Sequence, residues 1–217
     1  MKHIVVFLLT LTLTLHAQQV IIKAAQDVKY LSQQMANDYL LYFYNPRHFN
    51  YAKSLQHSLQ KLKTDLRTIA TNTNNEDIRS VLDYLSYTKD EIADILQEKV
   101  DKARAEKMLD FSQTLQEGAG AILETLGVKS RDDVATLRYH IIRLSTFYLA
   151  KHLHFDETEN TKAISHETVL IDMMSKKASS IFRTSWIDYK RLYQPSSYFL
   201  PHLVSLATDD LCNKAEK

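Results

Sequence analysis

The sequence has 217 residues, of which 45% are hydrophobic and 24% are charged. It contains only three Gly and three Pro, whereas average usage would give about 15 Gly and about 11 Pro in a chain of this length. So few breakers mean few tight turns, which excludes sandwiches, barrels and Gly-loop nucleotide folds and favours long helices.

The N-terminus has the pattern of a secretory signal peptide. A short positive start, Met1-Lys2-His3, precedes an apolar stretch from Ile4 to Leu15, and Ala17 is a small residue directly before Gln18. This pattern predicts cleavage after Ala17 and export to the periplasm. The apolar stretch is short for a bilayer span, which takes about 20 residues. An uncleaved membrane anchor is the alternative.

Charge and cysteine content limit the classes of partner that we expect for residues 18–217. Residues 18–217 carry 26 Lys and Arg against 26 Asp and Glu, because the basic residue removed is Lys2. This neutral balance gives no electrostatic reason to bind nucleic acid or an anionic membrane. We therefore expect no nucleic-acid partner and no membrane-embedded segment after cleavage. Cys212 is the only cysteine, which excludes an intrachain disulfide. It lies in a polar stretch, either as an incidental thiol or as one that pairs between chains.

Helical periodicity begins directly after the expected cleavage point. Apolar residues recur at steps of three and four from Gln18 to Tyr44, which predicts an amphipathic helix that ends before Pro46. A second helix is expected at about 51–70, followed by a polar loop at 71–75.

A third helical stretch begins near Glu76 and carries several internal signals. Thr88 and Glu91 form a capping-box pattern, which predicts a pause there. Residues 98–107 are almost all charged or Ala and are typical of a solvated helix. Gly127 is a good left-handed stop.

The second half predicts elements of the same kind. Residues 130–133 form an N-cap pattern with acidic residues in the first turn, and an apolar stripe then runs from Val134 to Tyr148. Residues 155–162 are polar and predict a loop. Further helices are expected at about 165–182, 185–192 and 197–212, with a break at 195–197.

The two halves suggest an internal duplication. Tyr30, Tyr39 and Leu40 match Tyr139, Tyr148 and Leu149 at a constant offset of 109, and 80–84 resembles 185–189. The alternative is that any two amphipathic helices share some Tyr and Leu. The predicted fold is an all-α antiparallel helical bundle of the four-helix type. Its expected parts are a signal peptide at 1–17, a first module at 18–127 and a second module at 128–217, packed with approximate two-fold symmetry.

One segment carries a family resemblance. Residues 31–40 read Leu-Ser-Gln-Gln-Met-Ala-Asn-Asp-Tyr-Leu. This segment resembles a run in the N-terminal domain of type IV pili methyl-accepting chemotaxis transducers. That domain is a PilJ-type, NarX-like helical sensor module of bacterial chemoreceptors and nitrate sensor kinases. The resemblance covers roughly residues 20–100 and implies ligand sensing in signal transduction. Family members usually have Ala-Gly-x-x-Arg-Met just before the run, and in nitrate sensors that Arg helps to hold the anion.

Here the preceding stretch reads Ala25-Gln26-Asp27-Val28-Lys29-Tyr30. Lys29 keeps the positive charge of the family's Arg but lacks the planar fork that grips an oxyanion. In the proposed repeat, Arg138 is the counterpart of Lys29. A Lys–Arg pair across the bundle would bind a small anion or carboxylate, whereas ordinary snorkelling cations are the alternative. The candidate ligand-binding residues are Lys29, Tyr30, Gln33, Arg138 and Tyr139.

Other constellations point elsewhere. His152 and His154 precede acidic residues, but positions i and i+2 of one helix point apart, so we assign no metal site. No nucleophile motif, Walker loop or haem-attachment motif is present, and we predict neither catalysis nor a cofactor. Aromatic residues flank Pro46 and Pro195, where they would plug the bundle ends or form a ligand or docking patch.

The sequence therefore predicts an exported, non-catalytic, sensor-like helical bundle. It would bind a small ligand, a partner such as a membrane sensor kinase or chemoreceptor, or both, and a homodimer is a further candidate state. The alternatives are a structural or interaction protein of the cell envelope without a small-molecule ligand and, third, a metal- or haem-handling bundle.

Overall fold

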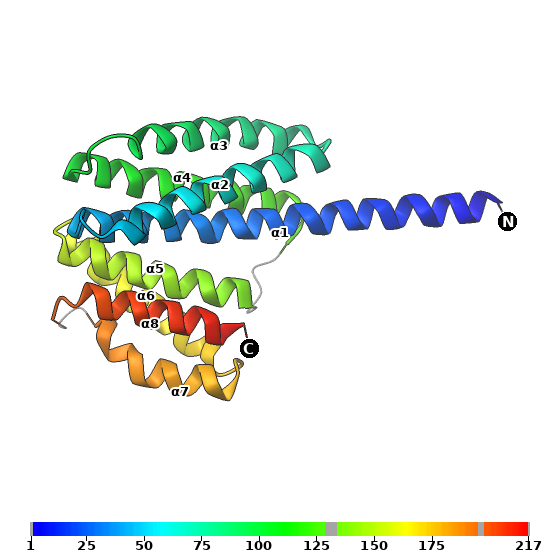
Figure 1. The fold of residues 1–217 in the computed structure, drawn as a ribbon. Coiled ribbons are helices and arrows are strands. Elements are labelled where there is room, and N and C mark those ends of the chain that lie inside the picture. Colours follow the sequence, from blue (N-terminus) through cyan, green and yellow to red (C-terminus); the bar gives the residue numbers. More distant parts are fainter. Residues whose placement is uncertain (1, 129–133, 195–197, 217) are drawn as a thin grey trace.

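The computed structural model describes residues 2–128, 134–194 and 198–216, with side chains described from residue 17 onward. These residues form eight α-helices and one 3-10 helix, η1, and they contain no strand (Figure 1). The predicted all-α helical bundle is confirmed. The elements are α1 (Lys2–Tyr44), α2 (Phe49–Asn72), α3 (Glu76–Ile95), α4 (Lys102–Thr125), α5 (Val134–His152), α6 (Glu157–Ser175), α7 (Ser180–Tyr189), η1 (Lys190–Tyr193) and α8 (Pro201–Ala215).

Helices α1 to α4 form an up-down-up-down group. Each helix runs opposite to the one before it, α1 packs against both α2 and α4, and α3 packs against both α4 and α2 (Figure 1). Apolar stripes on these helices face a common core that includes Leu62, Leu85 and Leu115. Gly127, with φ at +71°, follows α4 in the left-handed conformation that stops a helix.

Helices α5 to α8 repeat this arrangement. α5 packs against α6 and α8, and α7 packs against α8 and, less extensively, against α6. Trp186 and Tyr193 are fully buried here and anchor α7 and η1. Pro201 begins α8, where its missing N–H costs no hydrogen bond.

The two halves meet along α1 and α5, which run parallel (Figure 1). We call this contact the seam. Polar side chains bridge it, because Asn37 Nδ2 donates to Ser145 Oγ at 2.7 Å and Thr146 Oγ1 donates to the Gln33 carbonyl at 3.3 Å. Buried hydrogen bonds of this kind fix the register of the two helices, since an unpaired partner would be costly.

Burial repeats along the chain with the predicted offset of 109. The buried residues Met35, Tyr39 and Leu40 of α1 correspond to the buried residues Leu144, Tyr148 and Leu149 of α5. In the next pair of helices, Leu55, Ser58 and Leu62 of α2 correspond to Ile164, Glu167 and Ile171 of α6. The two hairpin loops, 45–48 and 153–156, also have equal lengths. Equivalent positions are therefore buried to a similar degree in the two hairpins.

The predicted pause at Thr88 is wrong. Helix α3 continues through it, because Thr88 is buried and its Oγ1 donates to the Tyr84 carbonyl at 3.1 Å instead of capping a new helix. The chain turns at 96–101, where Asp101 caps α4 by accepting a hydrogen bond from the Arg104 N–H at 2.9 Å. Residues 98–107 are therefore a turn followed by the start of a helix.

The predicted loop at 155–162 is also shorter than expected. Helix α6 already begins at Glu157, because Asp156 adopts a left-handed conformation and accepts a hydrogen bond from the Glu159 N–H at 3.2 Å. Polar composition does not distinguish a loop from the start of a helix here, since acidic and polar residues also stabilise a helix N-terminus.

The single helix expected at 165–182 is split in two. The chain breaks at 176–179, where Ser179 caps α7 by accepting from the Phe182 N–H at 3.3 Å. Arg183 reaches back and donates to the Ser175 carbonyl at 3.3 Å, which satisfies the end of α6. The N-cap expected at 130–133 and the break expected at 195–197 lie outside the described residues.

Cys212 is not in a polar tail. It lies in α8 with its side chain buried, and burial raises the pKa of the thiol to about 12. This position disfavours the pairing between chains that its sequence context left open.

Candidate functional site

Four of the five predicted site residues lie on the seam, in two reciprocal pairs. The Lys29 ammonium lies 4.4 Å from the centre of the Tyr139 ring, and the Arg138 guanidinium lies 4.6 Å from the centre of the Tyr30 ring. An offset of 109 converts one pair into the other. Each half thus supplies a cation that covers a tyrosine of the other half, an arrangement that cation–π attraction favours.

Lys29 and Arg138 do not converge on one site. Arg138 lines a cavity of about 370 Å³ between α1, α2 and α5, which we call the first-half cavity. Lys29 lies instead near Arg143 and Glu167, in what we call the Glu167 cluster. The lining of the first-half cavity combines three strong cations with one carboxylate: Lys23, Gln26, Asp27, Tyr30, Leu31, Gln34, His57, Ser58, Lys61, Ala135 and Arg138.

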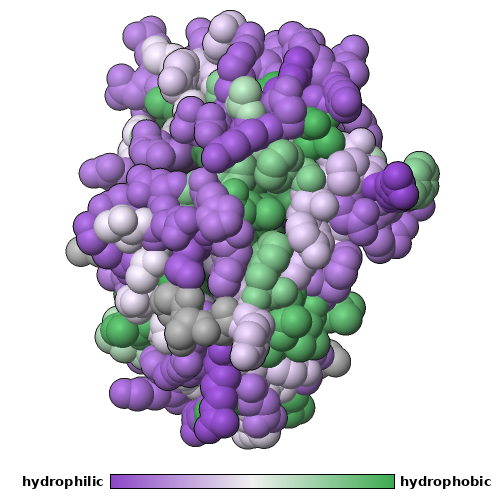
Figure 2. All heavy atoms as spheres, turned by 90° about the vertical axis from the view of Figure 1, so that its left-hand side faces the viewer, coloured by the Kyte–Doolittle hydropathy of each residue, from purple (hydrophilic) through white to green (hydrophobic). Residues whose placement is uncertain are grey.

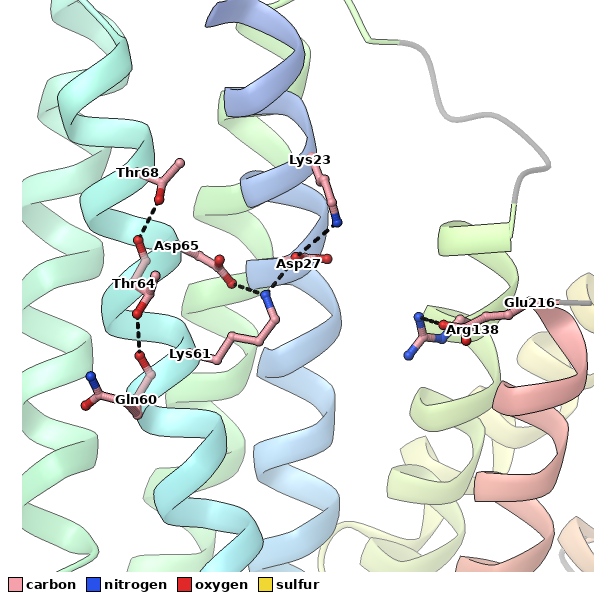
Figure 3. A network of polar contacts seen from close by, with 9 residues as sticks. All are labelled: Lys23, Asp27, Gln60, Lys61, Thr64, Asp65, Thr68, Arg138 and Glu216. Atoms are coloured by element: carbon pink, nitrogen blue, oxygen red, sulfur yellow. Dashed lines mark hydrogen bonds and ion pairs between the residues drawn. The ribbon is translucent and has the colours of Figure 1, made fainter.

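Lys61 is the hub of an ion-pair network in this cavity (Figure 3). Its ammonium lies 2.7 Å from Asp27 and 2.9 Å from Asp65, and Lys23 approaches Asp27 from the other side at 3.8 Å. Burial alone would lower the pKa of Lys61, but the hydrogen bonds to both carboxylates outweigh it and raise the pKa. Lys61 therefore stays charged and joins α1 to α2.

Arg138 enters the cavity from α5. Its guanidinium is paired with Glu216, which is half-exposed, as Figure 3 shows. Its Nε is buried and has no hydrogen-bond partner. A buried donor without a partner costs roughly 1–3 kcal/mol of stability. Arg138 Nε can therefore still donate a hydrogen bond to an added acceptor. Burial also raises the pKa of the neighbouring Tyr30, which stays neutral and able to donate a hydrogen bond.

The Glu167 cluster lies at the equivalent place in the second half. Glu167 is 1% exposed, and its carboxylate lies 2.6 Å from His140 Nδ1 and 3.1 Å from Arg143. Burial first and the charge of Arg143 second lower the pKa of Lys29. In this half, therefore, a carboxylate of the chain itself meets the cations.

Gln33 is in neither cation–tyrosine pair and does not line the first-half cavity. It is buried, and its amide donates to Ser112 Oγ at 3.1 Å and to Gln116 at 3.4 Å. It lines a separate cavity of about 370 Å³ together with Arg143 and Thr146. Its contacts join α1 to α4 inside the first half.

Sequence reasoning missed the second helix of each hairpin. His57, Ser58 and Lys61 of α2 line the first-half cavity, and Glu167 of α6 occupies the equivalent cluster. The repeat supplied a usable signal, because the same offset of 109 that pairs Tyr30 with Tyr139 also pairs Ser58 with Glu167. It was applied only to the first helix of each hairpin and to short segments farther on.

The histidines do not gather around a common point. Among the residues that the structure describes, no group of three or more His, Cys, Asp or Glu side chains could hold a metal ion. His140 and His166 lie beside Glu167, whereas His154 pairs with Glu157 at the surface at 2.5 Å. Their contacts are ion pairs and hydrogen bonds within the chain.

The aromatic residues at the helix ends pack across the two halves. The rings of Tyr44 and Phe199 lie 5.1 Å apart, and His152 stacks on Phe199 at 5.3 Å. Tyr51 and His202 share a hydrogen bond of 2.9 Å. A hydrophobic stripe runs down this end of the molecule between hydrophilic areas (Figure 2). These contacts match the interpretation that aromatics plug the bundle end.

Comparison of the chain with protein-family models, with curated proteins and with solved structures finds no match. The resemblance of residues 31–40 to PilJ-type and NarX-like sensor modules therefore stays a prediction from the sequence. Among the described residues, no helix is both long enough and apolar enough to cross a membrane.

Proposed function

We propose that this protein is an exported, non-catalytic, sensor-like helical bundle that binds a small anionic ligand in the first-half cavity. The observation that carries the proposal is the position of Arg138. It lies across the seam, over Tyr30, with a buried Nε that has no partner, and it faces a cavity also lined by Lys23 and Lys61. Arginine suits this task because its planar fork matches oxyanion geometry.

The position of the cavity suits the transmission of a signal. Its walls come from α1 and α2 of the first half and from α5 of the second half. A ligand held there would touch both sides of the seam and would favour the relative placement of the two halves in which its contacts are best. The proposed partner is a membrane sensor kinase or chemoreceptor that reads this placement, as the resemblance at residues 31–40 implies.

Two features support export. Residues 1–17 have the composition of a signal peptide, and the N-terminal part of α1 extends beyond the other helices (Figure 1). Gln18, the first residue of the expected mature chain, already contacts the bundle, because its side-chain amide donates to the Leu126 carbonyl at 3.3 Å. N-terminal sequencing of the protein from the cell envelope should begin at Gln18. An intact N-terminus would contradict cleavage and favour the anchored form.

Thermal unfolding with added anions tests ligand binding. Nitrate, sulfate, phosphate and acetate are compared with chloride at equal ionic strength. A ligand at 100 times its Kd stabilises the native state by about 2.7 kcal/mol, which corresponds to roughly 5–10 °C for a chain of this size. Arg138→Ala should abolish the shift, whereas Lys107→Ala, which removes an exposed cation outside the cavity, should preserve it. No shift with any of these anions at millimolar concentration would refute the proposal.

The second candidate is an interaction protein of the cell envelope. One observation favours it, because the outer helices of the second half expose large apolar side chains: Val169, Met173, Ile181, Ile187, Leu203 and Leu206. Such residues mark contact surfaces when they lie close together. Light scattering of the purified protein and crosslinking in the envelope test it. A monomer that yields no crosslinked partner would exclude this candidate.

A further inference from the structure

The two hairpins place different residues at one equivalent buried position. Ser58 in α2 and Glu167 in α6 are both 1% exposed, and they are separated by the repeat offset of 109. Their buried neighbours keep the same register, since Leu55 corresponds to Ile164 and Leu62 to Ile171. Ser58 and Glu167 thus point from the same turn of equivalent helices toward the first helix of their own hairpin and toward the seam.

In the second half, this position is filled by a carboxylate. The two oxygens of Glu167 meet His140 at 2.6 Å and Arg143 at 3.1 Å, and the cation that crosses the seam there, Lys29, lies close enough for the charge of Glu167 to raise its pKa. A buried carboxylate persists only when cations and hydrogen-bond donors surround it in this way.

In the first half, the carboxylate is missing but the cation that crosses the seam is present. Serine is shorter than glutamate by a CH₂–COO⁻ unit, and the first-half cavity of about 370 Å³ opens beside Ser58. Arg138 is the counterpart of Lys29, and its buried Nε lacks a partner. The counterparts of His140 and Arg143, which hold Glu167, are the uncharged Leu31 and Gln34. Volume and a cation whose charged partner is the half-exposed Glu216 therefore coincide where the other half has an acid side chain.

We propose that the ligand is a small organic acid whose carboxylate takes, in the first-half cavity, the place that the Glu167 carboxylate takes in the second half. This inference rests on the proposed function and specifies its ligand. Arg138 and Tyr30 would hold the carboxylate, and the amides of Gln26 and Gln34, which also line the cavity, would contact the remainder of the molecule. Asp27 on the same wall disfavours a second carboxylate close to the first.

The first experiment introduces at position 58 the acid side chain that Glu167 provides in the second half. Ser58→Glu should fill the cavity and reduce acetate and propionate binding, measured by calorimetry, at least tenfold. Ser58→Gln has almost the same volume without the charge and should also block binding. It should melt at a lower temperature than Ser58→Glu, and this difference should vanish when Arg138→Ala is added to both. Lys107→Ala, which removes an exposed cation outside the cavity, should bind acetate within threefold of the unchanged protein.

The second experiment works in the opposite direction and does not depend on the folding of the grafted variant. Glu167→Ala removes the internal carboxylate and leaves its cations without a partner. Acetate and formate should then raise the melting temperature of Glu167→Ala by several degrees more than they raise that of the unchanged protein. Nitrate at the same ionic strength serves as the inorganic control.

The results separate this inference from the proposed function. If nitrate, sulfate or phosphate stabilises the protein through Arg138 while acetate and propionate do not, anion binding stands and the organic-acid assignment is overturned. If Ser58→Glu and Ser58→Gln melt alike with Arg138 present, or if acetate fails to rescue Glu167→Ala better than nitrate, the assignment is likewise overturned. If no anion binds, the proposed function itself fails.

Discussion

In the second half of the protein, a buried glutamate lies among cations, whereas at the equivalent position of the first half a serine borders an open cavity. The backbone scaffold is the same in both places: two antiparallel helices, a loop of equal length and a tyrosine covered by a cation from the other half. Ser58 stands in place of Glu167, and Leu31 and Gln34 stand in place of its partners His140 and Arg143. The second half therefore has a buried ion cluster where the first half has a cavity. Under the proposed function, the second half satisfies its buried cations internally, whereas the first half would take a ligand at the equivalent place.

The largest expected effect concerns Glu167. Its replacement by alanine leaves Arg143 and His140 without their buried carboxylate partner and should lower the free energy of unfolding by about 3 kcal/mol. Ser58→Ala, at the equivalent position, should cost less than about 1 kcal/mol. Urea unfolding of both variants measures the difference. Equal losses of stability in Glu167→Ala and Ser58→Ala would contradict the difference between the two halves, because the two positions would then have the same structural role.

A second contrast lies along α1, at Asp38. Burial raises the pKa of Asp38 to about 7, although Ser54 donates a hydrogen bond to it at 2.6 Å. The equivalent residue of the second half is Phe147. The unfolded-state pKa of an Asp is about 3.9, so the native state holds a proton between these values that the unfolded state has lost. Stability contributed by Asp38 is therefore complete below about pH 4 and is lost as the pH rises through about 7.

Asp38→Asn should remove the loss of stability that ionisation of Asp38 causes as the pH rises. We expect little change in the free energy of unfolding at pH 4.5 and a gain of roughly 2 kcal/mol at pH 8. Chemical denaturation across this pH range measures it, with Asp110→Asn as an exposed control. An unchanged pH dependence would show that the Asp38 carboxyl ionises freely in the native state.

The glycines of α4 test how closely the helices of the first half approach. A Cβ added at Gly118 would lie 2.5 Å from Leu85 Cδ2 and 3.0 Å from its Cγ, whereas one added at Gly120 would meet nothing within 4 Å. Gly118→Ala should therefore destabilise the protein by about 1–2 kcal/mol through overpacking. Gly120→Ala should stabilise it by up to about 1 kcal/mol through helix propensity. Thermal melting compares the two, and a stabilising Gly118→Ala would contradict the close contact between α3 and α4.

The smallest expected effect on stability is that of Glu216, which is about half-exposed and pairs with Arg138. Glu216→Gln should change the free energy of unfolding by less than about 0.5 kcal/mol. It should nevertheless tighten acetate binding about threefold, because the guanidinium no longer has a competing carboxylate. Calorimetry and melting on the same samples measure both effects. Weaker binding in this variant would indicate that Glu216 helps to build the cavity.

The sequence was most informative where periodicity was long and uninterrupted. Apolar steps of three and four located the end of α1 and both ends of α2 within a few residues, although α1 begins at Lys2 and not at Gln18. Gly127 marked the stop after α4. Predicted helix boundaries were wrong where a polar side chain can make either of two kinds of hydrogen bond. Thr88 donates to a carbonyl within α3 instead of capping a new helix, and Asp156 caps α6 inside a segment with the composition of a loop.

The candidate site was predictable in part. The offset that matches Tyr30 with Tyr139 placed the right residues together but predicted a Lys29–Arg138 pair, whereas each cation covers a tyrosine of the other half. The sequence could not tell whether Lys29 and Arg138 face one cavity or two. This depends on how the two halves pack across the seam, where α1 and α5 run parallel. Gln33 was placed with the site from its position in the motif, whereas its side chain turns toward α4.

The parallel seam also has a consequence for how the protein folds. Within each half, consecutive helices lie antiparallel and in contact, so most native contacts join residues that are near in sequence, a topology that folds quickly. The seam is different, because its bond from Asn37 to Ser145 spans 108 positions. Closing so long a loop costs little more conformational entropy than closing a short one, but it requires α1 and α5 to have formed already. We therefore expect the two hairpins to assemble first and the polar seam to close last, as the slowest step of folding.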